Sequence, residues 1–235
     1  MKLGIMQPYF LPYIGYFALI QYTDVFIFFD TPQYISHGWV NRNRILKQGG
    51  GINYMIVPIA KAHRETSIKD IRIKASERWR ERIIGQLSIY KKAPYYRQGI
   101  TLMNKILYSE DNSLARLNIN GIKFVCDFLG IHQNFQVFSE MSLLINEVHA
   151  PDEWALNIAQ ALNFDTYVNP PGGKTFFDGT KYRRHGIKLE FLQAKLPPYV
   201  QRTGHFEAGL SILDAIMFCT REEIMNMLSD YEILR

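Results

Sequence analysis

Residues 36–44 concentrate side chains that could bind a phosphorylated, hydroxyl-rich small molecule. This stretch, Ser-His-Gly-Trp-Val-Asn-Arg-Asn-Arg, holds an imidazole, an indole, two amides and two guanidinium groups. Arginine binds phosphate or carboxylate through two parallel hydrogen bonds, and amides donate to and accept from sugar hydroxyls. The indole offers a flat apolar face on which a sugar or a base can stack. The binding candidates here are Trp39, Asn41, Arg42, Asn43 and Arg44.

His37 is the candidate catalytic residue of this stretch. An imidazole titrates near neutral pH, so it can act as a general base toward an attacking amine. The alternative, a surface histidine without a catalytic role, stays open. The same expected loop, residues 30–48, begins with Asp30, a further candidate for substrate binding.

A second group of candidates lies in residues 7–16, directly after the first apolar segment. Two prolines stiffen this loop, and Gly15 permits close approach of the backbone where a helix is expected to begin. The N-terminus of a helix that follows a strand is a natural anion site. The binding candidates are Gln7, Tyr9, Tyr13 and Tyr16. A purely structural role, in which the tyrosines cover the end of a sheet, remains open.

Two later loops carry the remaining candidates. The turn Asn-Pro-Pro-Gly-Gly-Lys at residues 169–174 offers backbone N–H groups and a cation, although its spacing is not that of a P-loop. Its candidates are Gly172, Gly173 and Lys174, with a plain turn and a surface lysine as the alternative. Residues 198–214 contribute Tyr199, Gln201, Ser211 and Asp214. Because no Gly-x-Ser-x-Gly motif accompanies Ser211 and Asp214, a packing or capping role is favoured for these two.

The elements expected to position these loops alternate between strand and helix. Unbroken apolar runs are typical of strands that are covered on both faces, as in a parallel sheet. Strands are expected at residues 2–6, 25–29, 53–59, 68–73, 135–138, 166–169 and 188–192, and helices at 16–22, 76–90, 94–108, 113–129, 151–162, 210–218 and 221–231. This order predicts an α/β fold with a mostly parallel sheet, helices on both faces and a helical insertion in the middle. We expect a single domain over residues 1–235, with the helical elaboration at about 76–130. Ligands of such folds bind at the carboxyl ends of the strands.

Composition excludes several other classes of protein. The chain has 27 Lys and Arg against 22 Asp and Glu, a formal charge of +5, and 47% hydrophobic residues. This balance is typical of a folded protein, and no nucleic-acid recognition pattern is visible, so no nucleic acid is expected as a partner. With two cysteines and no metal-ligand spacing, neither a disulfide framework nor a metal site is expected. Without a signal peptide or an apolar span, a cytoplasmic location is expected. The cofactor is unknown, and homo-oligomerisation stays open.

Two resemblances add to this interpretation. The order strand, Pro-containing loop, Tyr13-Ile14-Gly15-Tyr16 and helix resembles the opening of nucleotidyltransferase-type Rossmann folds, which implies a Rossmann-like fold. In those proteins a His-x-Gly-His tetrad holds the phosphates of ATP. Here tyrosines stand at both histidine places, and a phenol with a pKa near 10 supplies no cation at neutral pH. This departure argues against adenylyl transfer.

The second resemblance extends over nearly the whole chain. Residues 6–17, Met-Gln-Pro-Tyr-Phe-Leu-Pro-Tyr-Ile-Gly-Tyr-Phe, are similar to the opening of the WbqC-like family. The similarity continues through Trp-Val-Asn-Arg-Asn-Arg-Ile at 39–45, Tyr-Lys-Lys-Ala-Pro-Tyr at 90–95, the turn at 169–173, Tyr-Val-Gln at 199–201, Phe206, and Leu-Ser-Ile-Leu-Asp at 210–214. It implies a bacterial protein of O-antigen or other surface polysaccharide (lipopolysaccharide) biosynthesis. It supplies no catalytic residues.

Together the residues and the resemblance predict a transferase that modifies a nucleotide-linked amino sugar, by acyl or aminoacyl transfer. In this hypothesis Arg42, Arg44 and Lys174 bind phosphates, and Asn41 and Asn43 bind hydroxyls. One alternative is an ATP-dependent nucleotidyltransferase or adenylating ligase, and another is a non-catalytic protein that binds sugar nucleotides. Each hypothesis requires the loops near residues 13, 39, 172 and 199 to converge on one polar cleft.

Overall fold

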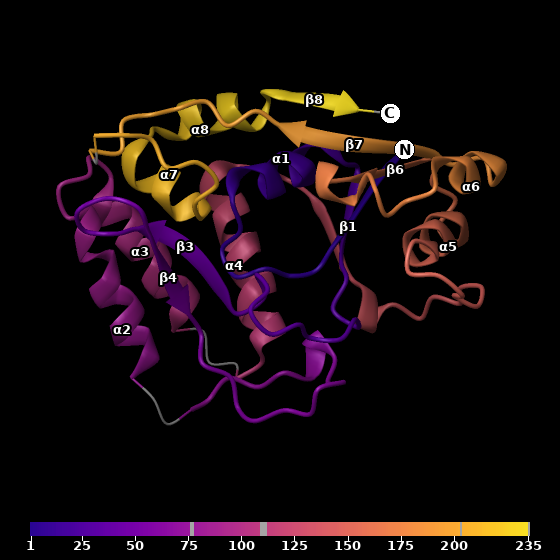
Figure 1. The fold of residues 1–235 in the computed structure, drawn as a ribbon, viewed down its shortest axis with the longest axis horizontal. Coiled ribbons are helices and arrows are strands. Elements are labelled where there is room, and N and C mark those ends of the chain that lie inside the picture. The colour runs from indigo at the N-terminus through magenta and orange to yellow at the C-terminus, as the bar shows by residue number, and fades with distance from the viewer. Residues whose placement is uncertain (76–77, 109–111, 203, 235) are drawn as a thin grey trace.

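The computed structural model describes residues 1–75, 78–108, 112–202 and 204–234. Within them, six strands form one sheet in the order β5-β2-β1-β6-β7-β8 (Figure 1). Neighbours pair in parallel except β7 and β8, which are antiparallel. The strands are β1 (Lys2–Met6), β2 (Val25–Phe28), β5 (Asn134–Val137), β6 (Thr166–Asn169), β7 (Lys188–Ala194) and β8 (Tyr231–Leu234). The expected α/β, Rossmann-like fold with a mostly parallel sheet is confirmed.

Helices cover both faces of this sheet, as expected. Residues of β2 alternate between the two sides because successive side chains of a strand point to opposite faces. Phe26 and Phe28 pack into one core with α1 (Ile14–Tyr22), α4 (Leu114–Leu129), α7 (Ile212–Phe218) and α8 (Arg221–Leu228). Val25 and Ile27 pack into a second core with α5 (Glu153–Ala161) and α6 (Gly179–Arg184). All four residues of β2 are buried, which explains its unbroken apolar sequence.

A separate antiparallel hairpin corrects the expected loop at residues 30–48. Its strands are β3 (Arg42–Leu46) and β4 (Ile52–Ile56), with Arg42 opposite Ile56 and Leu46 opposite Ile52. The strand expected at residues 68–73 is also wrong: Ile68–Asp70 form a 3-10 turn, and Ile73 makes only an isolated bridge to Ile59. Whether the segments at residues 42–46 and 68–73 form strands depends on the pairing partner that the tertiary structure provides, which local sequence does not show.

The middle of the chain is helical and packs beside the hairpin. It contains α2 (Trp79–Gln86), a 3-10 turn at Leu87–Tyr90, α3 (Tyr96–Leu107) and α4. Residues 76–77 and 109–111 of the expected helical elaboration lie outside the described residues. Ser113 caps α4 by accepting a hydrogen bond from the Arg116 N–H, and Gly130 ends it with a φ of +74°. None of the helices in the described ranges is long and apolar enough to cross a bilayer.

Candidate functional site

A cleft of about 580 Å³ lies at the carboxyl ends of β1 and β6. From β1 the chain continues to β2 on one side, while β6 pairs with the other side, so these strand ends form a topological switch point. Ligands of α/β proteins bind at such points. The cleft is lined by Met6, Tyr9, Pro12, Tyr13, Trp39, Asn43, Arg44, Asn169, Pro170, Pro171, Gly172, Gly173, Leu196 and Gly209.

The loop that follows β1 is held by its main-chain carbonyl groups. Asn43 Nδ2 donates to the carbonyl oxygens of Phe10 (2.9 Å) and Leu11 (2.8 Å), and the Ser211 hydroxyl also donates to Leu11 O (2.8 Å). Asn118 Nδ2, on the buried side of α4, donates to Pro8 O at 2.9 Å. Further donors are the Tyr16 hydroxyl to Gln7 O (2.9 Å) and the Ile212 N–H to Pro12 O (2.9 Å). These bonds fix the backbone of the loop before any ligand binds.

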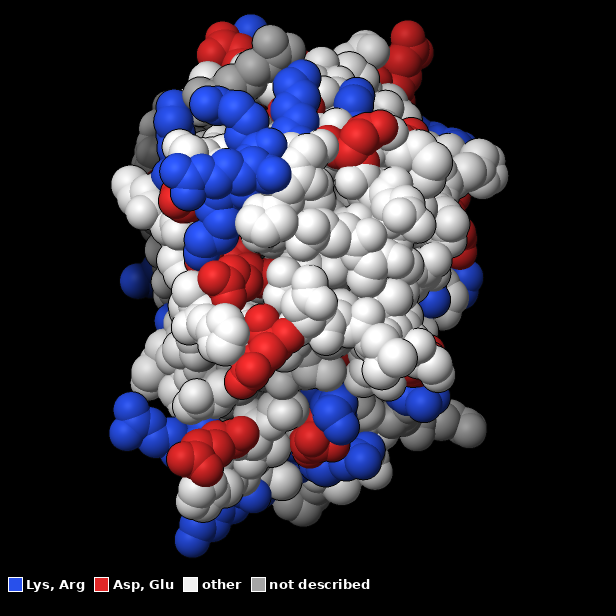
Figure 2. Space-filling model, turned by 90° about the vertical axis from the view of Figure 1, so that its right-hand side faces the viewer, with Lys and Arg blue, Asp and Glu red and all other residues white. Residues whose placement is uncertain are grey.

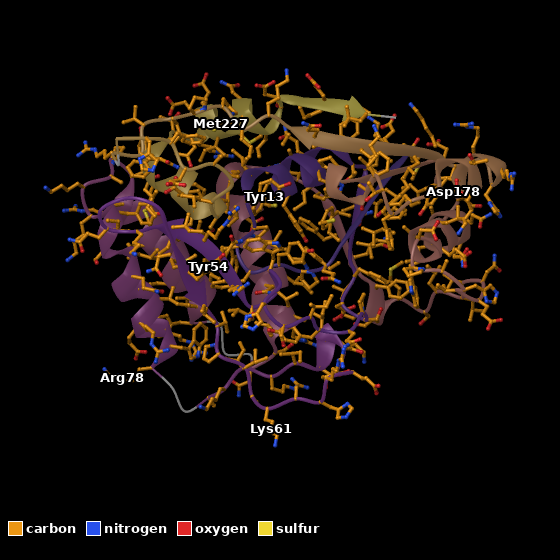
Figure 3. The ribbon with its side chains drawn as sticks, in the orientation of Figure 1. Tyr13, Tyr54, Lys61, Arg78, Asp178 and Met227 are labelled. Carbon is orange, nitrogen blue, oxygen red and sulfur yellow. The ribbon has the colours of Figure 1, made fainter. Side chains whose placement is uncertain are left out.

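Two tyrosine rings project from this fixed loop into the cleft. Burial raises the pKa of both the Tyr9 and the Tyr13 hydroxyl, so both phenols stay neutral at physiological pH. A Cβ at Gly15 would lie 2.5 Å from the Tyr13 ring, so the glycine is what lets that ring rest against the start of α1. Tyr13 lies near the middle of the view in Figure 3, where Tyr54 marks the hairpin. The rings offer flat faces and neutral hydroxyl groups to a ligand.

Arg44 of β3 is the charged residue of the cleft lining. Its guanidinium carbon lies 5.2 Å from the centroid of the Trp39 ring, and Nη2 donates to Gly209 O at 2.7 Å. Its Nε is buried and has no hydrogen-bond partner within the described residues, and no carboxylate among them pairs with Arg44. A fixed guanidinium without a neutralising carboxylate is suited to binding an anion.

The turn after β6 forms the opposite wall. The hydroxyl of Tyr167 donates to Asn169 Oδ1 (2.8 Å), and Asn169 Nδ2 donates to Pro170 O (2.8 Å). A Cβ at Gly173 would lie 2.1 Å from Asn169 Nδ2, so a glycine is needed for this close contact. Gly172 is exposed and has open space around it. The turn therefore presents backbone to the cleft with no side chain in between.

A comparison with protein families matches residues 7–226 to the model of the WbqC-like protein family. The chain belongs to the WbqC-like family. A curated relative from Mycobacterium tuberculosis, Uncharacterized protein Rv1507c, is 27% identical over 219 residues, which are 92% of each chain. No solved structure matches the chain. The family match confirms the resemblance seen in the sequence, and it spans every segment that lines the cleft apart from Met6.

The structure of this WbqC-like chain brings together seven of the expected site residues. These are Tyr9, Tyr13, Trp39, Asn43, Arg44, Gly172 and Gly173. They come from the loop after β1, the loop before β3, β3 itself and the turn after β6. Asn43 holds the loop backbone with its amide nitrogen, and its Oδ1 accepts from the Arg44 N–H at 2.8 Å. In the structure Asn43 therefore positions the loop, and its contact with ligand hydroxyls stays a prediction.

His37 does not occupy the position of a general base for this cleft. It lies on an exposed turn with a φ of +64°, outside the lining. Arg42 donates to the carbonyl oxygen of His37, and its guanidinium carbon lies 4.8 Å from the centroid of the Tyr54 ring. A base must lie within hydrogen-bond reach of the proton it removes, so a catalytic role for His37 stays a prediction that this cleft does not support. Arg42 holds this turn and does not line the cleft.

Other expected contacts are also displaced from the cleft. Tyr16 is 1% exposed and belongs to the core, where burial raises its pKa well above the usual value. The Asp30 carboxylate accepts from the N–H (3.0 Å) and the hydroxyl (2.6 Å) of Ser139. Asn41 Nδ2 donates to Val57 O at 3.0 Å. Gln7 and Lys174 line two other cavities.

The four candidates from residues 198–214 form a buried support behind the cleft. The Tyr199 hydroxyl and Gln201 Nε2 both donate to Asp214 Oδ2, at 2.5 and 2.8 Å. Burial raises the pKa of Asp214, and these two hydrogen bonds oppose that rise. Ser211 caps α7 by accepting from the Leu213 N–H. The network holds the segment that carries Leu196 and Gly209 into the cleft wall.

Sequence reasoning missed seven residues that line the cleft of this WbqC-like chain and one residue, Asn118, that supports it from α4. The seven are Met6, Pro12, Asn169, Pro170, Pro171, Leu196 and Gly209. Asn169 could have been found, because it ends the apolar run of β6 at the edge where ligands bind. Asn118 interrupts the buried face of α4, and a buried amide in a helix signals a specific hydrogen-bond partner. Gly209 has a φ of +66° and gave no signal in the sequence.

Proposed function

We propose that this protein is a transferase that binds a nucleotide-linked amino sugar in the cleft and modifies the sugar, by acyl or aminoacyl transfer. The observation that carries the proposal is the position of Arg44, a cation without a carboxylate partner among the described residues, beside three aromatic side chains and an open glycine turn. A diphosphate needs the cation and the backbone N–H groups, and a base or sugar ring needs the flat aromatic faces. The polysaccharide role implied by the family resemblance supports this class of substrate.

This cleft can raise the reaction rate by positioning its two substrates. The loop after β1 is fixed by hydrogen bonds to five of its carbonyl groups, from Gln7 to Pro12. Holding a sugar amine against a donor carbonyl in one geometry converts an encounter between two molecules into a reaction within one complex. The neutral Tyr9 and Tyr13 hydroxyls can orient the amine through hydrogen bonds.

Binding is tested by isothermal titration and thermal shift with UDP-N-acetylglucosamine, UDP and free N-acetylglucosamine as probes. At 100-fold excess over Kd, a bound probe stabilises the fold by about 2.7 kcal/mol. We expect the two nucleotides to bind and Arg44→Ala to weaken them by about tenfold or more, because a charge-assisted hydrogen bond is lost. Lys47→Ala is the matched control, since Lys47 is exposed and follows β3 outside the lining. Unchanged binding by the Arg44 variant would disprove the proposal.

A second candidate, a non-catalytic protein that binds sugar nucleotides, is favoured by the chemistry of the lining. The described residues that line the cleft include no Asp, Glu, His or Lys, so none of them is an obvious proton acceptor. Mass spectrometry separates the two candidates. UDP-N-acetylglucosamine or its deacetylated amine is incubated with acetyl-CoA, or with ATP and amino acids. Binding without any mass change would favour the non-catalytic protein, while an acylated product would establish the transferase.

The adenylating alternative finds less support in the site. Tyr16 stands at one histidine place of the nucleotidyltransferase tetrad, and it lies in the core. Tyr13 stands at the other place and is neutral, because burial raises its pKa. Pyrophosphate exchange with labelled ATP tests this alternative directly.

A further inference from the structure

A second cavity lies on the opposite side of the β1 end from the cleft. Its volume is about 510 Å³, which is within the range of small-molecule sites. Residues of β1 and the loop after it alternate between the two: Met6 and Tyr9 line the cleft, whereas Ile5 and Gln7 line the second cavity. Two further segments contribute to both. Residues 31–39 place Ile35 in the cavity and Trp39 in the cleft, and residues 170–177 are divided in the same way.

Aromatic rings form the walls of this cavity. Trp154 of α5 lies 5.4 Å from Phe29 between ring centroids, and Phe177 lies 5.5 Å from Tyr167 and 5.1 Å from Phe176. Such ring pairs hold one another in place, so the walls are preformed. Ile35, Trp154 and Phe176 nevertheless remain 64%, 36% and 52% exposed. Large apolar side chains that gather around a hollow and stay exposed mark a binding site.

The polar groups of the cavity indicate what kind of ligand it accepts. Among the residues that the structure describes, those lining the cavity carry no charge, so an ion would lose its hydration without gaining a partner. The Thr31 hydroxyl is buried and has no hydrogen-bond partner within the described residues. The Gln7 side chain lines the same cavity. Figure 2 views the molecule from the side of α5 and α6, where Lys and Arg gather in one part of the face and a wide neighbouring area carries no charged side chain.

We infer that this cavity is a second ligand site, for an uncharged apolar or aromatic group that carries one hydrogen-bonding atom. The group packs among Phe29, Trp154 and Phe177, and its polar atom meets the Thr31 hydroxyl after that side chain rotates, because the hydroxyl is closed off in the conformation described. The inference stands apart from the proposed function, because it uses neither Arg44 nor any nucleotide. If the protein is a transferase, the shared walls place this site beside the nucleotide cleft.

The test uses phenylacetamide and phenylacetate, which share a ring and differ in charge. In a Trp39→Phe variant the remaining tryptophans are Trp154 and Trp79, and Trp79 is fully buried in the core. We expect phenylacetamide to change the fluorescence of this variant in a saturable way, and phenylacetate to bind at least tenfold more weakly. Thr31→Val should weaken phenylacetamide about two- to tenfold, as loss of one hydrogen bond does. Thr101→Val, on the exposed side of α3, is the control and should leave binding unchanged.

Three outcomes would overturn the inference. Equal affinity for the amide and the carboxylate would show that the missing charge of the lining does not select the ligand. An unchanged affinity in the Thr31 variant would remove the hydroxyl from the site. Without ligand, acrylamide quenching of Trp154 fluorescence could weaken as the protein concentration rises. That result would show that a second copy of the chain covers the cavity.

Discussion

Asp214 illustrates how single residues behind the cleft determine stability. Its side chain has no exposed surface, and Tyr199 donates to it at 2.5 Å. We expect Tyr199→Phe to lower the free energy of unfolding at pH 7 by about 1–3 kcal/mol, the cost of leaving a buried acceptor without its donor. Tyr108→Phe is the control, because Tyr108 is 54% exposed. Urea unfolding of both variants measures the difference.

The pH dependence of the same variant follows from the sign of the pKa shift. Burial raises the pKa of Asp214 in the folded state, so the folded state binds this proton more tightly than the unfolded chain does. The buried carboxylate therefore costs stability at neutral pH, and this cost is relieved as the pH falls through the raised pKa. Because Tyr199 favours the carboxylate form, the loss caused by Tyr199→Phe should shrink on acidification. A loss that grows between pH 7 and pH 5 would contradict this account.

Among the elements, α4 positions the cleft through one side chain. Asn118 Nδ2 donates to Pro8 O and to Val40 O (2.6 Å), and so joins the loop after β1 to the loop before β3. Asn118→Ala leaves two buried carbonyl groups without this donor, which should cost about 2–4 kcal/mol of unfolding free energy. Nucleotide affinity should fall as well, because both loops line the cleft. Asn104→Ala, at an exposed position of α3, should change neither quantity. Urea unfolding and titration with UDP measure both effects.

The end of α4 and the last turn of α2 give a matched pair of glycine substitutions. Gly130 has a left-handed backbone conformation, and a Cβ there would lie 1.7 Å from Nη2 of Arg221. The Arg221 side chain is held in this place because its Nε donates to Leu129 O. Gly130→Ala should destabilise the fold by at least about 1–2 kcal/mol. Gly85 lies in α2, and a methyl group added to it would meet no atom outside its own helix within 4 Å, so Gly85→Ala should stabilise by about 0.5–1 kcal/mol. Thermal unfolding would reveal the opposite signs, and equal signs would refute the assignment.

Strands buried on both faces could be predicted from the sequence, as could amphipathic helices such as α4. The runs at β1, β2 and β6 are apolar because helices cover them on both sides, and their bounds agree closely with expectation. Of the hairpin, β4 overlaps the strand expected at residues 53–59, but β3 was missed because its sequence, Arg-Asn-Arg-Ile-Leu, is half polar and resembles a loop. The strand β8 was missed because it directly follows α8 and exists only through pairing with β7. Local patterns carry no information on such long-range partners.

Stability in acid depends on carboxyl groups in several parts of the molecule, because folding lowers their pKa values. The backbone N–H of His149, together with Lys181 and the Ala150 N–H, lowers the pKa of Glu153 from 4.5 to about 2. The stability that Glu153 contributes is present above pH 4.5 and is lost as the pH falls toward 2. We expect Glu153→Gln to be less stable at pH 7 and to lose less stability over this range. Glu222→Gln, at an exposed position of α8, should follow the parent chain. Denaturant titrations at several pH values measure both.

The convergence of distant loops was predictable at the scale of the molecule, while the role of each side chain was not. Tyr13 and Gly172 meet because both follow strands of one parallel sheet, whose carboxyl ends lie along one edge. His37 was expected in the cleft because it shares residues 36–44 with an indole, two amides and two guanidinium groups. However, a left-handed turn directs this stretch toward solvent, and Arg42 holds the turn. Whether a polar side chain faces a ligand or the chain's own carbonyl groups depends on contacts that spacing does not encode.

In the loop after β1, the groups that fix the backbone differ from the side chains that line the cleft. Its path is maintained by bonds to peptide oxygens, which every amino acid possesses, and the donors sit on α4, β3 and the residue that caps α7. The rings of Tyr9 and Tyr13 take no part in those bonds. Replacement of either ring by another side chain would therefore alter what the cleft accepts without moving the backbone that carries it. A scaffold of this kind can acquire new ligand preferences through single substitutions, and laboratory selection for altered specificity would best begin at these two positions.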